Sequence, residues 1–127
     1  MIKLFSGLGF GGPDILAPLS YWLSTDEHLA NVCNGCGPQG WKGKLVPDSI
    51  WGLSIAECCG VHDWMYEYGY TAADKARADN VFLANMYRTI NKNTRFRWLR
   101  RLRRHRAKIY YTAVLKFGHK HFTVTED

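Results

Sequence analysis

The sequence of 127 residues is 46% hydrophobic and 14% aromatic, which suits one compact domain over residues 1–127 and excludes a disordered chain. No apolar run reaches the roughly 20 residues of a membrane span, and glycines before Pro13 interrupt any signal-peptide core, so the sequence alone indicates no localisation. The net charge of +6 is uneven, because residues 92–127 carry +9 and residues 1–91 carry −3. This distribution predicts a phosphate-bearing partner, either a membrane surface or nucleic acid.

The first third of the chain is predicted to hold little regular structure. Residues 1–13 are rich in glycine and are expected to be irregular. Pro13–Ser24 is a short apolar segment, and a helix there would be interrupted by Pro18. We expect it to form one wall of the core or a lip around an apolar substrate channel. Residues 33–44 hold four glycines and a proline, which excludes a regular helix or strand. This segment is either a plain surface loop or one that turns its backbone toward an ion.

Two helices joined by a very short link are predicted next. Ser54–Glu57 has the pattern of a capping box, so a helix is expected from there to about Tyr68. Thr71–Asp74 has the same pattern and begins a second helix that runs to about Asn91. Because the link around Gly69 is so short, the two helices are expected to form an antiparallel hairpin.

In such a hairpin, residues at equal distances from the turn face each other, and this places His62 opposite Asp79. Each is the polar exception on an apolar stripe with helical spacing. The stripes are Ile55, Cys58 or Cys59, His62, and Met65 or Tyr66 on the first helix, and Ala76, Asp79, Phe82 or Leu83, Met86 and Ile90 on the second. A buried carboxylate is costly unless it is paired. We therefore predict a buried His62–Asp79 pair, either structural or catalytic.

A third long helix is predicted from Arg95 to about Lys116. Its apolar residues recur at near-helical spacing, and basic residues cover most of the remaining surface; the apolar set is Phe96, Leu99, Leu102, Ile109 and Ala113. Three interpretations stay open. The helix could be packed with a solvated basic face, it could bind nucleic acid, or it could lie on a membrane with apolar residues in the lipid. The residues that would enter the lipid are Phe96, Trp98, Leu99 and Leu102.

Asp63 follows His62 directly, and adjacent residues of a helix point about 100° apart. If His62 faces Asp79, Asp63 faces elsewhere, and we expect it to point toward the Gly-rich loop 33–40. One carboxylate with backbone carbonyls forms an oxygen-only site, which suits Ca²⁺ better than Zn²⁺. His62 would then be the base that activates water, and Asp79 would fix its tautomer. The ion would polarise an ester carbonyl and stabilise the oxyanion.

Three segments of the chain resemble parts of the secreted phospholipase A2 family, and they occur along the chain in the order calcium loop, active-site helix and second helix. Cys58–Cys59–x–x–His62–Asp63–x–x–Tyr66 looks like the active-site helix of that family. Cys33–Asn34–Gly35–Cys36–Gly37 resembles its calcium loop, and Asp74–Phe82 resembles its second helix. The resemblance covers about residues 33–90. It implies an all-α, phospholipase A2-like fold with an antiparallel helix hairpin, a Gly-rich calcium loop and a basic C-terminal helix.

The resemblance also implies calcium-dependent hydrolysis of the sn-2 ester of glycerophospholipids, which releases a fatty acid and a lysophospholipid. His62 would activate water, Asp79 would orient His62, and Tyr66 would hydrogen-bond Asp79. The backbone amide of Gly35 would help to bind the oxyanion. Ca²⁺ would take the carboxylate of Asp63 and the backbone carbonyls of Cys33, Gly35 and Gly37. The implied partner is an anionic phospholipid surface, bound peripherally, and the implied site of action is secreted or membrane-peripheral.

The sequence departs from the family at its cysteines. Met65 stands where the family usually has a cysteine, and no cysteine follows Cys59. The family's disulfides from this helix to the second helix and to the C-terminus therefore cannot form. The loop cysteines could instead pair with those of the helix. At most two disulfides are possible among Cys33, Cys36, Cys58 and Cys59, and we expect one.

Two further functions are compatible with the sequence. Cys33–x₂–Cys36, with Cys58 or Cys59 and His62, has the ligand types of a structural zinc module. Such a module would contact nucleic acid or a membrane through its Arg-rich helix, and its carboxylates would have no role. The chain could also be an inactive relative of the phospholipases that binds lipid without cleaving it. The intact His62, Asp63 and Asp79 argue against that second alternative.

Overall fold

The computed structural model describes residues 2–7, 14–33, 46–118 and 122. Helices account for 69% of these residues, and two small two-stranded sheets complete the regular structure. The expectation of a largely helical fold is thus confirmed, but the fold is not all-α. The strands were not predicted from the sequence because each has only two or three residues. Such a strand is too short to show an alternating apolar and polar pattern.

The first sheet pairs β1 (Leu4–Ser6) with β2 (Leu16–Pro18) in antiparallel register. The prediction of irregular structure before residue 13 is therefore wrong for β1. The side chain of Asn85 holds the sheet against the helices, because it accepts from the backbone N–H of Leu16 at 2.7 Å and donates to the carbonyl of the same residue at 2.8 Å. This buried amide makes the two bonds that a neighbouring strand would make.

Two short helices follow this sheet. Pro18 ends β2 and is the N-cap residue of α1 (Leu19–Leu23). The proline thus precedes a helix instead of interrupting one, which is compatible with its fixed φ and missing N–H. Thr25 caps α2 (Asp26–Val32), because its hydroxyl accepts from the backbone N–H of His28.

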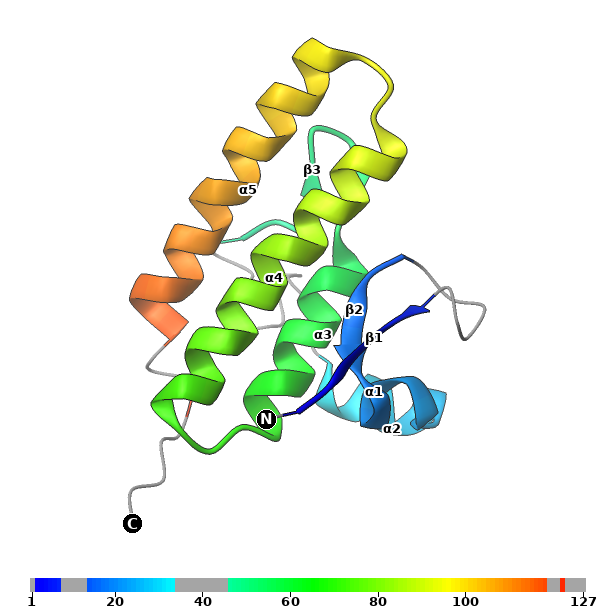
Figure 1. Cartoon of the computed structure of the whole chain (residues 1–127), viewed down its shortest axis with the longest axis vertical. Helices are drawn as coiled ribbons and strands as arrows, with labels where there is room; N and C mark the ends of the chain where they lie inside the picture. Colours follow the sequence, from blue (N-terminus) through cyan, green and yellow to red (C-terminus); the bar gives the residue numbers. More distant parts are fainter. Residues whose placement is uncertain (1, 8–13, 34–45, 119–121, 123–127) are drawn as a thin grey trace.

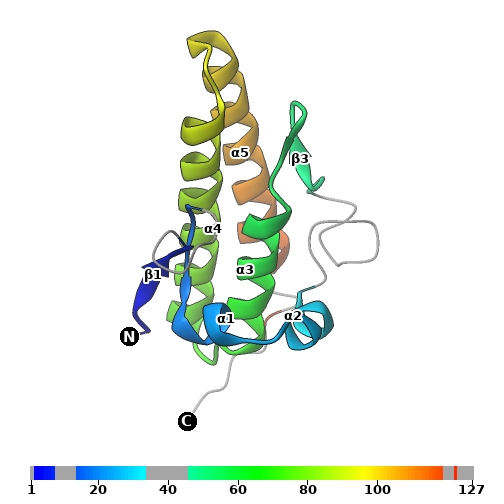
Figure 2. The same ribbon diagram turned by 90° about the vertical axis from the view of Figure 1, so that its right-hand side faces the viewer.

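The predicted hairpin is present as α3 (Ala56–Glu67) and α4 (Ala72–Asn93), which lie side by side and antiparallel (Figures 1 and 2). Thr71 and Asp74 form the predicted capping box at the start of α4. The capping box predicted at the start of α3 is wrong, because α3 has no side-chain cap. The carboxylate of Glu57 accepts instead from the Tyr21 hydroxyl at 2.6 Å, which ties α1 to α3.

The basic helix α5 (Arg97–Phe117) packs along α4 (Figure 1). Its buried residues are Ala107, Tyr110 and Val114. The predicted apolar stripe is therefore only partly the face that packs: Ala113 lies against the core, whereas Phe96, Leu102 and Ile109 are exposed. Apolar residues thus lie on two faces of α5, and the buried face is the one that carries Ala107, Tyr110 and Val114.

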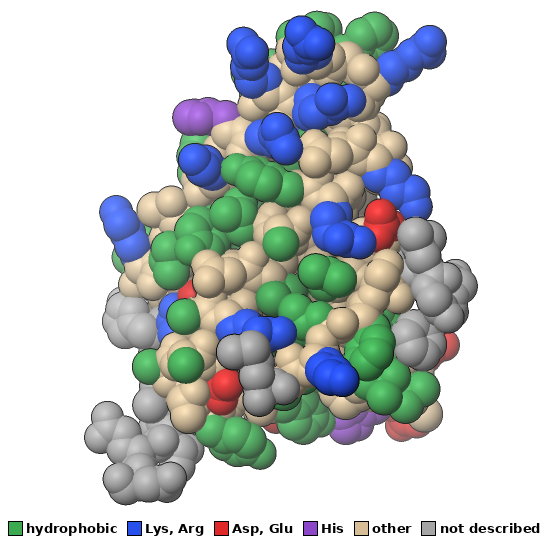
Figure 3. All heavy atoms as spheres, viewed as in Figure 1, with side chains coloured by type: hydrophobic (Ala, Val, Ile, Leu, Met, Phe, Trp, Pro, Cys, Tyr) green, Lys and Arg blue, Asp and Glu red, His purple; other side chains and the backbone are tan. Residues whose placement is uncertain are grey.

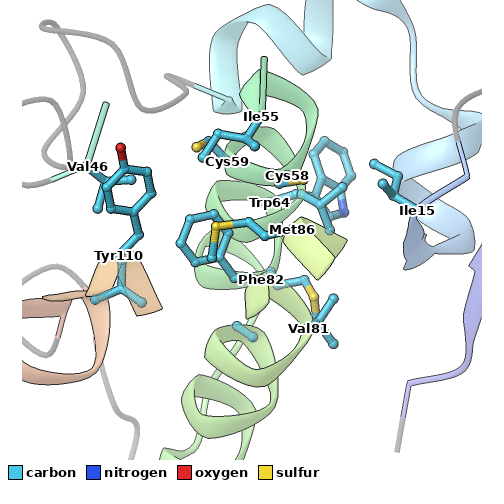
Figure 4. Close-up of a cluster of buried hydrophobic side chains, with 14 of the residues drawn as sticks. Ile15, Val46, Ile55, Cys58, Cys59, Trp64, Val81, Phe82, Met86 and Tyr110 are labelled. Carbon is cyan, nitrogen blue, oxygen red and sulfur yellow. The ribbon is translucent and has the colours of Figure 1, made fainter. Parts of the chain in front are cut away.

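The core is formed where α3 and α4 meet β2, β3 (Ser49–Ile50) and α5 (Figure 4). Phe82 and Met86 of α4 are fully buried, as are Cys58 and Cys59 of α3. The core therefore surrounds the inner face of the hairpin. A second sheet of β3 and β4 (Leu53–Ser54) leads directly into α3. None of the helices in the described part of the chain combines the length and apolar character of a membrane span.

Candidate active site

His62 on α3 and Asp79 on α4 form the buried polar centre of the hairpin. The Nε2 atom of His62 lies 2.7 Å from Oδ1 of Asp79. The exposed fractions are 1% for His62 and 0% for Asp79. The structure thus brings together the two residues that the short turn between the helices placed opposite each other.

Two further donors complete the environment of the Asp79 carboxylate. The hydroxyl of Tyr66 donates to Oδ1 at 2.6 Å, and the ammonium group of Lys75 donates to Oδ2 at 2.6 Å. Burial raises the pKa of Asp79, but the bonds from His62, Lys75 and Tyr66 outweigh burial and hold this pKa below its ordinary value. Asp79 is therefore a carboxylate at neutral pH, with both oxygens engaged.

Lys75 is the residue of this cluster that the sequence analysis missed. Lys75 and Asp79 are four residues apart on α4, which places their side chains on one face of the helix. This spacing is visible in the sequence and could have identified the pair. Lys75 counters the charge of Asp79 on the oxygen that His62 does not use.

Aromatic rings fix the orientation of His62. Its ring lies 4.2 Å from that of Tyr66 and 4.9 Å from that of Phe82, measured between centroids. Burial, reinforced by the hydrogen bond to Asp79, raises the pKa of Tyr66. Tyr66 therefore stays a protonated phenol that donates to Asp79, and the His62 ring has little freedom to turn away from its partner.

Asp63 is buried on α3. Because adjacent residues of a helix point about 100° apart, its side chain leaves the helix in a different direction from that of His62. Cys33 ends α2, and its thiol donates to the backbone carbonyl of Gly60 at 3.1 Å. Gly60 and Asp63 are three residues apart, so they share one face of α3. The first residue of the predicted calcium loop therefore lies against the helix face that carries Asp63. Gly35 and Gly37, the other predicted loop ligands, lie outside the described residues.

The cysteines differ in chemical state. Cys59 is disulfide-bonded, whereas Cys33 and Cys58 retain their thiols. Cys36, the remaining cysteine of the sequence, lies outside the described residues. Cys58 is packed near the hydroxyl of Thr89 at 3.5 Å, and burial raises its pKa to about 11. The Cys58 thiol is therefore protonated and unreactive at neutral pH.

Within the described residues, no three His, Cys, Asp or Glu side chains are grouped so that they could hold one metal ion. The calcium site predicted from the sequence needs only one side chain, that of Asp63, and takes its other ligands from backbone carbonyls. Such a donor set contains only oxygen atoms and suits a hard cation.

An apolar cavity of about 610 Å³ lies between β1 and the helix hairpin. Trp64 and Met65 of α3 line it together with Val81 of α4. Pro18 and Ser20 also line it, so the segment that was predicted to form a core wall or a channel lip borders this cavity. His62 and Asp79 are not among the lining residues.

Comparisons of the chain with known protein families, with curated proteins and with solved structures found no match.

Proposed function

We propose that this protein hydrolyses the sn-2 ester of glycerophospholipids in a calcium-dependent reaction, with a phospholipase A2-like fold and active site. The observation that carries the proposal is the buried cluster in which His62 and Tyr66 both bond one oxygen of Asp79. The resemblance of the sequence assigns these three residues, and the cluster has the contacts that their proposed roles require. The products are a free fatty acid and a lysophospholipid.

His62 is the general base of the proposed reaction. Its Nε2 atom is bonded to Asp79, so Nδ1 is the nitrogen that takes a proton from the attacking water. Asp79 fixes the tautomer with hydrogen on Nε2 and stabilises the imidazolium that forms when the water is deprotonated. The same proton then passes from Nδ1 to the leaving alkoxide of the lysophospholipid. Tyr66 and Lys75 keep the carboxylate of Asp79 in position throughout.

The residues of the chain fit a calcium ion next to His62. Asp63 supplies a buried carboxylate, and Cys33, the first proposed carbonyl ligand, ends α2 against the same face of α3. Gly35 and Gly37 complete the proposed carbonyl set, and the Gly35 amide is the proposed oxyanion donor. When bound, Ca²⁺ polarises the ester carbonyl and stabilises negative charge on its oxygen.

The alternative zinc module is less well supported by the same residues. Zinc needs cysteine thiolates, but Cys59 is disulfide-bonded and the Cys58 sulfur is packed against the hydroxyl of Thr89. Metal analysis of the purified protein separates the two proposals. One tightly bound zinc per chain, unaffected by calcium, would favour the zinc module over the hydrolase.

The proposed substrate places the protein at an anionic phospholipid surface as a peripheral protein. The test is release of fatty acid from mixed phosphatidylcholine and phosphatidylserine vesicles in which the sn-1 and sn-2 chains differ in mass. We expect only the sn-2 chain to be released, with calcium present, and no release after a calcium chelator is added. Release of both chains, or release that persists in the chelator, would contradict the proposal.

A further inference from the structure

Three large aromatic side chains are exposed at the end of the molecule where α4 leads into α5. The exposed fractions are 55% for Trp51, 57% for Phe96 and 63% for Trp98. Leu102, one turn after Trp98 on α5, is also exposed. We call these four residues the aromatic tip. Their exposure is costly in water, since burying one such side chain contributes about 1.5–3 kcal/mol.

Trp51 occupies a backbone position that is unfavourable for a bulky residue. Ile50 pairs with Leu53, so Trp51 and Gly52 form a two-residue hairpin turn. Both have positive φ, +45° and +81°, as in a type I′ turn, where asparagine and glycine are favoured. The Trp51 side chain is 55% exposed, so burial of its ring does not offset this backbone strain. Such a violation of local preference, with the side chain directed into solvent, is typical of a functional position.

Arginine side chains hold the turn of Trp51 against the link between α4 and α5. Arg103 donates to the carbonyl of Trp51 at 2.8 Å and to the hydroxyl of Thr94 at 2.9 Å. Arg100 donates to the carbonyl of Thr94 at 3.0 Å. The β3–β4 turn and the start of α5 consequently lie at the same end of the molecule (Figures 1 and 2).

Positively charged side chains lie next to the aromatic tip. Basic side chains gather around apolar ones at this end of the molecule (Figure 3). The exposed arginines nearest in sequence are Arg95, Arg97, Arg101 and Arg104. The segment 92–118 contains no Asp or Glu, so no acidic residue of this segment neutralises them. Tryptophan and arginine together are suited to the interface between lipid headgroups and acyl chains, where the ring is buried and the charge meets phosphate.

We propose that the aromatic tip docks the protein on an anionic phospholipid surface. Trp51, Phe96 and Trp98 enter the interface, and the neighbouring arginines contact lipid phosphates. The choice of lipid as the partner rests on the function proposed above. Nucleic acid would also attract the arginines, but it offers no equivalent apolar layer for Leu102.

The first test measures binding to sucrose-loaded vesicles by co-sedimentation, with a calcium chelator present so that no turnover is needed. One variant combines Trp51→Gly, Phe96→Ser and Trp98→Ser; glycine suits the positive φ at position 51. The control combines Leu23→Ser and Tyr70→Ser, which removes exposed apolar surface at the opposite end of the molecule. Circular dichroism verifies that both variants keep the helix content of the wild type.

We expect the wild type to bind vesicles with 30% phosphatidylserine at least about tenfold more tightly than pure phosphatidylcholine vesicles. The triple tip variant should lose at least about tenfold in affinity for the anionic vesicles, and the control should stay within about twofold of the wild type. Equal binding by the tip variant and the wild type would overturn the proposal. An equally large loss in the control would also overturn it, because the effect would not be specific to the tip.

The second test addresses the charge. Neutralising Arg97 and Arg101 with glutamine should weaken binding about 30-fold, because each basic residue near an anionic surface contributes about a fivefold gain in affinity. The control neutralises Lys108 and Lys116, which are farther along α5, and should lose less. If the wild type preferred duplex or single-stranded nucleic acid to vesicles, and the same variants lost that binding, the lipid assignment would be wrong.

These measurements can refute the docking surface and the proposed hydrolase function separately. Intact vesicle binding without any release of fatty acid would refute the proposed hydrolysis and leave the docking surface standing. Release of sn-2 fatty acid by the wild type, together with unchanged vesicle binding by the tip variant, would refute only the docking surface.

Discussion

The ion pair between Lys75 and Asp79 gives the sharpest prediction about stability. Lys75→Met keeps the length and the apolar part of the side chain but removes the charge from Oδ2 of Asp79. That oxygen belongs to a fully buried carboxylate, and the Lys75 side chain itself is only 14% exposed. The bonds from His62 and Tyr66 to the other oxygen remain.

The expected loss follows from the surroundings of the pair. Hydrogen bonds to charged groups contribute about 1.5–3 kcal/mol, and breaking a fully buried ion pair costs about 3–5 kcal/mol. Because Asp79 keeps two donors and Lys75 is slightly exposed, we expect a loss of about 2–3 kcal/mol in the free energy of unfolding at neutral pH. Lys108→Met, on the exposed side of α5, should stay within about 0.5 kcal/mol of the wild type.

The loss should also depend on pH. The pKa of Asp79 is held below its ordinary value of 3.8, so the stabilisation by this carboxylate is present above that value. It is lost as the pH falls through the pKa of the folded state. The difference between Lys75→Met and the wild type should therefore be largest near neutral pH and should shrink below about pH 3.8.

Urea unfolding followed by tryptophan fluorescence measures both effects when it is repeated from about pH 7 to about pH 3. A Lys75→Met variant as stable as the wild type at neutral pH would refute the reasoning. The same refutation would follow from a loss of equal size at every pH, because that loss would not come from the charge of Asp79. Lys75→Arg, which retains the charge, should recover part of the stability.

Three further predictions concern the cluster and the cysteines. Asp63→Asn should abolish calcium binding in a calorimetric titration, and an unchanged dissociation constant would exclude this residue as a ligand. Tyr66→Phe should lower the free energy of unfolding by about 1.5–3 kcal/mol, because it removes the hydrogen bond that the Tyr66 hydroxyl donates to the Asp79 carboxylate. An unfolding midpoint equal to that of the wild type would contradict this prediction. Denatured, unreduced protein should show the two thiols of Cys33 and Cys58 in a thiol assay, whereas four would mean that the disulfide is absent.

The helix hairpin and its polar contact could be predicted from the sequence because they depend on local signals. Thr71 and Asp74 supply the capping box that starts α4, and the short turn then determines which residues lie opposite each other. The contact between His62 and Asp79 follows from that register. It required no knowledge of the rest of the fold.

Features that depend on tertiary packing could not be predicted in this way. Glu57 has the sequence position of a capping residue, but its carboxylate instead accepts a hydrogen bond from the hydroxyl of Tyr21, which is distant in sequence. On α5, apolar residues occur on two faces, and periodicity alone could not decide that Ala107 is buried while Leu102 is exposed. The strand β2 is held by the side chain of Asn85, which leaves no pattern in the strand itself.

The proposed hydrolysis depends most on His62 as the general base. The most direct test compares the wild type with His62→Gln in the release of sn-2 fatty acid from mixed phospholipid vesicles at saturating calcium. A general base contributes about 10²–10⁴-fold to a rate, so we predict that the variant is slower by at least about 100-fold while it still binds calcium. A His62→Gln variant that releases fatty acid at the wild-type rate, or a wild type that releases none, would contradict the account.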